Sequence, residues 1–139
     1  MAPTNDPARL RLALPKGRMQ DGVFRLLADA SISLRAGERS YRPVISLSSF
    51  DVKILKPQNI VEMLEAGARD IGFAGADWVA ELEAGLVEVL DTRLDPVRLV
   101  AAAPADFLEN GVLPTKGPLV IASEYERLTK GWIRDQGIE

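Results

Sequence analysis

The sequence predicts an α/β fold with a largely parallel sheet, because short apolar runs alternate with amphipathic stretches of helical period. Its 139 residues, 47% of them hydrophobic, suffice for one modest globular domain of about 100–150 residues. Cys and His are both absent. The chain therefore cannot build a thiol nucleophile, a Ser-His-Asp triad, a disulfide or a usual zinc site, and its chemistry must use carboxylates, Lys, Arg, hydroxyls and backbone amides.

The first elements read as a strand, a helix and a hairpin. Residues 10–14 predict a strand, and the apolar spacing that follows predicts a helix whose opening Gly17 and Gly22 bracket. Two apolar runs, 44–47 and 52–55, are separated by four residues and predict a β-hairpin.

The next elements read as a helix, a strand and a helix. Apolar residues at helical spacing predict a helix over 58–66, with Gly67 at the position of a carboxyl cap. Residues 71–74 predict a short buried strand, and Asp77 is expected to cap a helix that ends near Gly85.

The last part of the chain continues the same alternation. Apolar runs predict strands at 86–90, 97–103 and 119–122, the second of them fully buried. A helix is expected to begin at Ser123, and Ile138 resembles the entry to a further strand.

Positive charge gathers in the first third of the chain, although the whole chain carries a formal charge of −3. Residues 1–42 hold eight basic side chains and four acidic ones. This pattern fits either a solvated basic face or a polyanion site, because a locally positive cleft attracts anions even in an acidic protein. We expect no nucleic-acid partner, since aromatic residues make up only 6% of the chain and the acidic remainder would repel a long phosphate backbone.

We also expect no membrane partner and a cytoplasmic location. No apolar run approaches the roughly 18 residues of a membrane span, and the start of the chain lacks the basic-then-apolar order of a secretory signal.

A basic turn at a predicted strand-to-helix junction is the first candidate site. Lys16 and Arg18 flank Gly17 there, and a helix amino terminus adds free N–H groups and a positive dipole end. The turn could hold a phosphate, or it could be an ordinary basic turn.

Two further segments are candidates. Small residues over 72–77 leave room for a ligand at the carboxyl edge of a parallel sheet, but Gly75 could instead serve helix packing and Asp77 could be a simple cap. The basic loop 35–42 could close over a phosphate through its arginines, or it could be solvated.

Four segments in order resemble the ATP phosphoribosyltransferase family: LRLALPKGRM, LKPQNIVEMLEAGARDIGFAGAD, VEVLDTRLDPVRLVAAAP and VIASEY. The resemblance spans about residues 9–139. It implies a periplasmic-binding-protein-like (type II) fold, with a first α/β lobe over 1–98 and the beginning of a second, apparently truncated, lobe over 99–139. It also implies a glycosyltransferase of histidine biosynthesis that uses Mg²⁺, joins N1 of ATP to the ribose carbon of phosphoribosyl pyrophosphate and releases pyrophosphate.

The resemblance also implies roles for individual residues. Lys16 and Arg18 would hold substrate phosphates, and Arg39 would close over the leaving pyrophosphate. Lys56 stands where relatives usually carry Arg. On this basis the catalytic residues are Arg18 and Arg39, and the substrate-binding residues are Lys16, Gly17, Lys56, Gly75 and Asp77. No residue is assigned as a metal ligand.

The family's phosphoribosyl loop, of pattern Asp-x-x-x-(Thr/Ser)-Gly-x-Thr-Leu, does not occur between Ala101 and Glu139. We therefore expect these 139 residues alone not to catalyse the transfer. The implied partners are ATP, phosphoribosyl pyrophosphate, and either further copies of the chain in a homo-oligomer or a histidyl-tRNA-synthetase-like regulatory subunit. The alternative is a non-catalytic module of the same fold that binds a nucleotide or a small anion.

Overall fold

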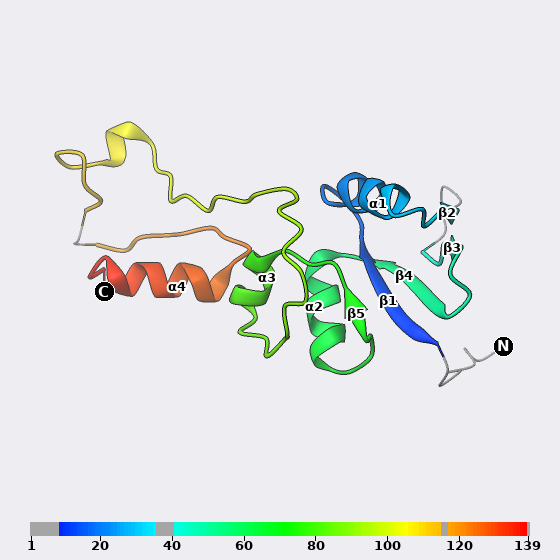
Figure 1. Cartoon of the computed structure of the whole chain (residues 1–139). Coiled ribbons are helices and arrows are strands. Elements are labelled where there is room, and N and C mark those ends of the chain that lie inside the picture. The colour runs from blue at the N-terminus through cyan, green and yellow to red at the C-terminus, as the bar shows by residue number, and fades with distance from the viewer. Residues whose placement is uncertain (1–8, 36–40, 115–116, 139) are drawn as a thin grey trace. The chain divides into compact units, whose positions relative to one another are not determined.

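The computed structural model describes residues 9–35, 41–114 and 117–138, and the chain forms two compact units, Met1–Pro96 and Val97–Glu139 (Figure 1). Three strands of the first unit, Leu10–Pro15 (β1), Phe50–Leu55 (β4) and Ile71–Gly72 (β5), form a parallel sheet. Its order is β4-β1-β5, so β1 is the central strand. The prediction of an α/β fold with a parallel sheet is confirmed.

A helix follows each strand of this sheet. Gln20–Asp29 (α1) follows β1, Pro57–Glu65 (α2) follows β4, and Ala76–Glu81 (α3) follows β5. Gly67 ends α2 as predicted, because its φ of +69° turns the chain back on the helix, where the N–H of Ala68 donates to the Met63 carbonyl at 2.8 Å.

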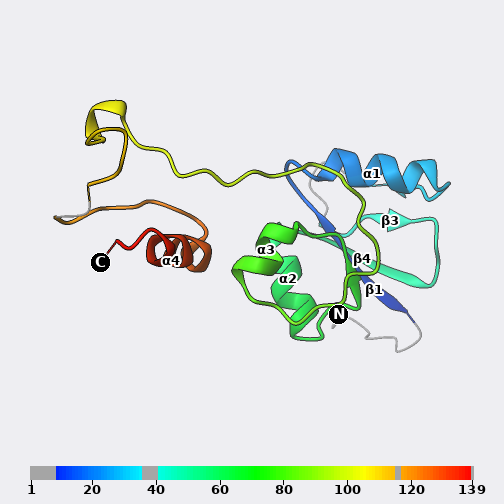
Figure 2. The same cartoon turned by 60° about the vertical axis from the view of Figure 1, so that its left-hand side comes forward.

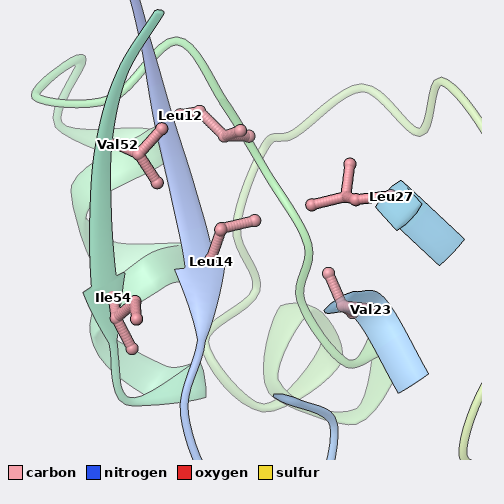
Figure 3. Close-up of a cluster of buried hydrophobic side chains, with 6 residues drawn as sticks. All are labelled: Leu12, Leu14, Val23, Leu27, Val52 and Ile54. Carbon is pink, nitrogen blue, oxygen red and sulfur yellow. The ribbon is translucent and has the colours of Figure 1, made fainter. Parts of the chain in front are cut away.

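The main hydrophobic cluster lies between the sheet and α1. Side chains alternate along a strand, so every second residue of β1 and β4 points to the same face. Figure 3 shows these side chains directed toward the buried residues of α1. The cluster consists of Leu12, Leu14, Val23, Leu27, Val52 and Ile54.

The opposite face of the sheet packs against α2, as the views in Figures 1 and 2 show. Ala13 lies on this face, and Ile60 and Val61 of α2 are fully buried. A Cβ built on Gly72 of β5 would lie 2.9 Å from Ile60 Cγ2 and 3.3 Å from Ala13 Cβ. Gly72 therefore allows the close approach of α2 to the sheet.

The predicted hairpin of 44–47 with 52–55 is wrong. Val44–Ile45 (β3) pairs antiparallel with Leu34–Arg35 (β2), whereas β4 forms a six-residue parallel ladder with β1. The ladder with β1 buries Val52 and Ile54 in the cluster under α1. That burial favours the parallel pairing over a local hairpin.

The predicted strands at 86–90, 97–103 and 119–122 are also not formed. The backbone there pairs with no strand among the residues that the structure describes, so its N–H and C=O groups have no neighbouring strand with which to form a sheet. The segment expected to be buried is exposed instead, with Val97 at 42% and Val100 at 68%.

The second unit contains a short 3₁₀ helix, Ala105–Phe107 (η1), and one α-helix, Glu126–Asp135 (α4). The helix predicted from Ser123 thus begins three residues later, and Ser123 Oγ instead accepts from the N–H of Tyr125 at 3.0 Å. Ile138 enters no strand, because its N–H donates to the carbonyl of Ile133 and closes the end of α4 at 3.3 Å. In the part of the chain that the structure describes, no helix has the length and apolar character of a membrane span.

Candidate functional site

The carboxyl ends of the three parallel strands meet at one edge of the sheet. Pro15 of β1 is in register with Leu55 of β4, and the N–H of Lys16 donates to the Leu55 carbonyl at 2.9 Å. On the other side of β1, the N–H of Phe73 donates to the Ala13 carbonyl at 3.2 Å. The segments that leave β1, β4 and β5 for their helices therefore lie side by side at this edge, which we call the carboxyl edge.

All but one of the predicted site residues lie in these three segments. After β1 come Lys16, Gly17 and Arg18, after β4 comes Lys56, and after β5 come Gly75 and Asp77. Arg39, the remaining predicted residue, lies outside the residues that the structure describes.

The turn after β1 carries Lys16 and Arg18 on either side of Gly17, which has a left-handed backbone conformation. Gly17 has φ +82°, which an L side chain rarely adopts, and its carbonyl accepts from the N–H of Gln20 at 3.0 Å. Met19 is the N-cap of α1 and makes no side-chain capping bond. The first turn of α1 therefore begins beside two basic side chains and has no side-chain capping bond from Met19, although Asp21 places one carboxylate in the same turn.

Lys16 and Arg18 each have a defined neighbour. The Lys16 ammonium lies 5.5 Å from the centroid of the Tyr41 ring, a cation-π distance. Arg18 Nε donates to Asp95 Oδ2 at 2.7 Å. Both basic groups are thus held at the edge by contacts with other segments of the first unit.

Lys56 occupies the N-cap position of α2, with Pro57 next in the helix. Its side chain is exposed, and its carbonyl accepts from the N–H of Ile60 at 3.1 Å. Since Leu55 pairs with Pro15, Lys56 adds a third cation to the carboxyl edge beside Lys16.

The segment of β5 and α3 differs from its prediction in three details. The strand is only Ile71–Gly72 and Ile71 is exposed, not buried, and the helix ends at Glu81, not near Gly85. The N-cap of α3 is Gly75, and Asp77 lies in the first helical turn instead of capping it. A Cβ on Gly75 would collide with Asp77 Oδ1. Gly75 therefore leaves space for the Asp77 carboxylate at the helix amino terminus, where the dipole stabilises a negative charge.

An ion pair between Arg11 and Asp70 lies at the other end of the sheet. Arg11 holds the carboxylate of Asp70 through its side chain at 2.6 and 3.0 Å, and its backbone N–H donates to the same carboxylate at 2.7 Å. The side-chain and backbone hydrogen bonds from Arg11 lower the pKa of Asp70 from 3.8 to about 2, and the bond with Asp70 raises the pKa of Arg11. This pair joins the start of β5 to β1. Because it lies at the opposite end of the strands, neither residue is part of the carboxyl edge.

The residues that the structure describes contain no group of three or more acidic side chains that could hold a metal ion. The carboxyl edge offers Lys and Arg donors, helix N–H groups and the carboxylates of Asp77 in α3, Asp21 in α1 and Asp95 beside Arg18. Such a set can bind phosphate groups and stabilise negative charge that develops on them.

Sequence reasoning missed two residues of this site. Asp95 contacts Arg18 across 77 positions of sequence, and only the turn signal of Asp95-Pro96 marks its neighbourhood. Tyr41 was seen as part of a basic loop, but no pattern in the sequence indicates that its ring lies near Lys16.

Comparison with known proteins identifies relatives of the chain. Residues 56–139, more than half of the chain, match the family HisG, described as ATP phosphoribosyltransferase. An ATP phosphoribosyltransferase of Pelotomaculum thermopropionicum is 35% identical over 135 residues, which cover 94% of this chain and 46% of that protein. One of Desulforudis audaxviator is 35% identical over 136 residues, covering 94% of this chain and 47% of that protein.

A solved structure, the ATP phosphoribosyl transferase (HisG:HisZ) complex from Thermotoga maritima, is 26% identical and has a TM-score of 0.48. The match covers 58% of this chain and 39% of that one. The chain spans about half the length of the curated relatives that it matches. By the match to the family and by these relatives, the chain belongs to the ATP phosphoribosyltransferase family.

Proposed function

We propose that this chain provides the phosphate-binding part of an ATP phosphoribosyltransferase, the enzyme of histidine biosynthesis whose reaction joins ATP to phosphoribosyl pyrophosphate. The observation that carries the proposal is the gathering of Lys16, Arg18 and Lys56 at the carboxyl edge, where open α/β sheets bind their ligands. Membership of the family supports the choice of substrates.

In the proposed reaction, N1 of the adenine ring attacks C1 of the ribose. A new N–C bond forms while the C–O bond to pyrophosphate breaks, and the electron pair of that bond leaves with pyrophosphate. The ribose carbon gains positive character and the leaving group gains negative charge. Arg18 and Lys16 would stabilise that negative charge, together with Arg39.

We propose that Mg²⁺ enters with the substrates. The described residues provide no carboxylate cluster, and Mg²⁺ commonly keeps its waters and binds substrate phosphates with only one or two protein carboxylates. We propose Asp77, in the first turn of α3, for this part. When bound, the metal would neutralise phosphate charge, while the basic side chains orient the phosphates.

We further propose that the first unit is a lobe of periplasmic-binding-protein-like (type II) fold and that the phosphoribosyl site needs a segment other than residues 101–139. The 139-residue chain alone is expected to form no phosphoribosyl-ATP. We also propose an assembly, either a homo-oligomer or a complex with a histidyl-tRNA-synthetase-like subunit. Mass measurement of the chain with and without such a subunit tests this assembly.

Isothermal titration calorimetry of the chain with ATP, and separately with phosphoribosyl pyrophosphate, each with Mg²⁺, tests the binding proposal. We expect one of them to bind and its affinity to fall in Lys16→Ala and in Arg18→Ala. Arg25→Ala is the matched control, because Arg25 is an exposed cation of α1 that lies beyond its first turn. Binding that is equal in all four proteins, or no binding of either substrate, would contradict a phosphate site at the carboxyl edge.

A further inference from the structure

Asp95 contacts the guanidinium of Arg18 at one nitrogen only, Nε. Its Oδ2 accepts from Arg18 Nε at 2.7 Å, and among the residues that the structure describes this is the single polar contact of the Arg18 side chain. The guanidinium has two further nitrogens, which carry the forked pair of donors that fits a phosphate. Arg18 is 68% exposed, so this pair of donors is accessible to a ligand.

Asp95 itself is well anchored. Its side chain is only 27% exposed. The preceding Leu94 packs against the core cluster and lies over Gly22 in the first turn of α1, 3.7 Å from the position of a Cβ there. Asp95 has φ +50° and is followed by Pro96, whose ring restricts the backbone further. The carboxylate is therefore presented to Arg18 from a packed turn.

We propose that Asp95 is a positioning residue, which fixes the Arg18 side chain through Nε and leaves its terminal nitrogens directed to a substrate phosphate. The inference rests on the proposed function, because it takes Arg18 as the phosphate ligand. The contact orders a long side chain before the phosphate arrives, so binding need not supply that ordering.

Two opposing effects of the carboxylate have different sizes. If phosphate binding must itself order the arginine side chain, the dissociation constant for phosphate rises by up to about 30-fold. One exposed ion pair changes that constant by only about 1.4- to 5-fold. Because the ordering effect has the larger upper limit, we expect positioning to outweigh the partial neutralisation of Arg18 by Asp95. Removal of the carboxylate should weaken phosphate binding by about three- to tenfold.

The test measures the dissociation constant of MgATP, and of Mg-phosphoribosyl pyrophosphate, for Asp95→Gly and Asp95→Asn. Glycine accepts φ +50° without strain, so Asp95→Gly removes the carboxylate and leaves the turn intact. Asparagine also tolerates this conformation and keeps an acceptor oxygen, so Asp95→Asn should lose less affinity than Asp95→Gly. The control is Asp29→Asn, an exposed carboxylate lost from the far end of α1, which should bind as the unaltered chain does.

A double-mutant cycle separates positioning from a general effect on stability. In an Arg18→Ala background, Asp95→Gly is expected to cause no further loss of affinity, because the side chain that it positions is gone. Tighter binding by Asp95→Gly would show that Asp95 competes with phosphate and would overturn the proposal. An equal loss with and without Arg18 would also overturn it. If Arg18→Ala alone leaves binding unchanged, the phosphate site itself is refuted.

Discussion

Replacing Gly72 with alanine should destabilise the first unit and leave the second unit unaffected. The added methyl would lie 2.9 Å from Ile60 Cγ2 and 3.3 Å from both Cβ and O of Ala13. Ile60 and Ala13 are completely buried, so neither can move into solvent. Ile60 Cγ2 branches directly from Cβ, so it retreats only if χ1 leaves its preferred rotamer. Overpacking of this kind costs about 1–3 kcal/mol of unfolding free energy.

Urea unfolding monitored by tryptophan fluorescence measures this cost. Trp78 lies in α3 of the first unit and Trp132 in α4 of the second, so a Trp132→Phe background reports the first unit alone. Gly85→Ala is the control, because a Cβ there meets nothing within 4 Å and the backbone φ is not positive.

A second substitution, at Ile60, should reduce the loss of stability caused by Gly72→Ala. Ile60→Leu moves the branch away from Cβ and removes Cγ2, so Gly72→Ala should cost less in that background. If Gly72→Ala unfolds at the same urea concentration as the unaltered chain, α2 does not approach the sheet closely enough for Ile60 to obstruct the added methyl.

Three further perturbations have defined outcomes. Leu14→Ala should lower the unfolding free energy by about 2–5 kcal/mol in the same assay, because Leu14 is fully buried in the core cluster, and a smaller loss would place it outside that cluster. The lowered pKa of Asp70, about 2, means that its ion pair with Arg11 stabilises the fold above about pH 4 and loses this effect as the pH falls through 2. Asp70→Asn should flatten the stability profile in this interval, and an unchanged profile would contradict the pairing. In a complete enzyme, Arg18→Ala should cost about 1.5–3 kcal/mol in kcat/KM, and unchanged values for both substrates would remove Arg18 from the site.

The sequence predicted strands, helices and helix ends correctly where the spacing of apolar residues matches the face that is buried in the structure. Alternating apolar residues in β1 and the helical spacing of α2 each matched a face that packs in the structure. Gly67 was recognisable as a helix end because its left-handed backbone excludes most other residues. These features depend on a few neighbouring residues, which is why they can be read from one sequence.

Pairing between distant segments could not be read in the same way. The run 52–55 is apolar and alternating whether it pairs with β1 or with its neighbour in sequence, and only burial against α1 distinguishes the two. The run 97–103 has the composition of a buried strand, yet composition provides no partner for its backbone. For the site, the strand-to-helix junctions predicted that the groups at 16–18 and 75–77 lie at strand ends, whereas Lys56 was indicated by the family resemblance alone. The contact of Arg18 with Asp95 depends on how the turn at Leu94 packs on α1.

The most direct test of the central claim, that the carboxyl edge binds substrate phosphate, is a map of backbone amide chemical shifts in ¹⁵N-labelled chain titrated with MgATP. We predict saturable shifts in residues 16–22, after β4 in 56–60 and after β5 in 73–79, with α4 unaffected, and we predict that Arg18→Ala weakens them. Shifts confined to the second unit, or shifts at the carboxyl edge that persist unchanged in Arg18→Ala, would contradict the claim.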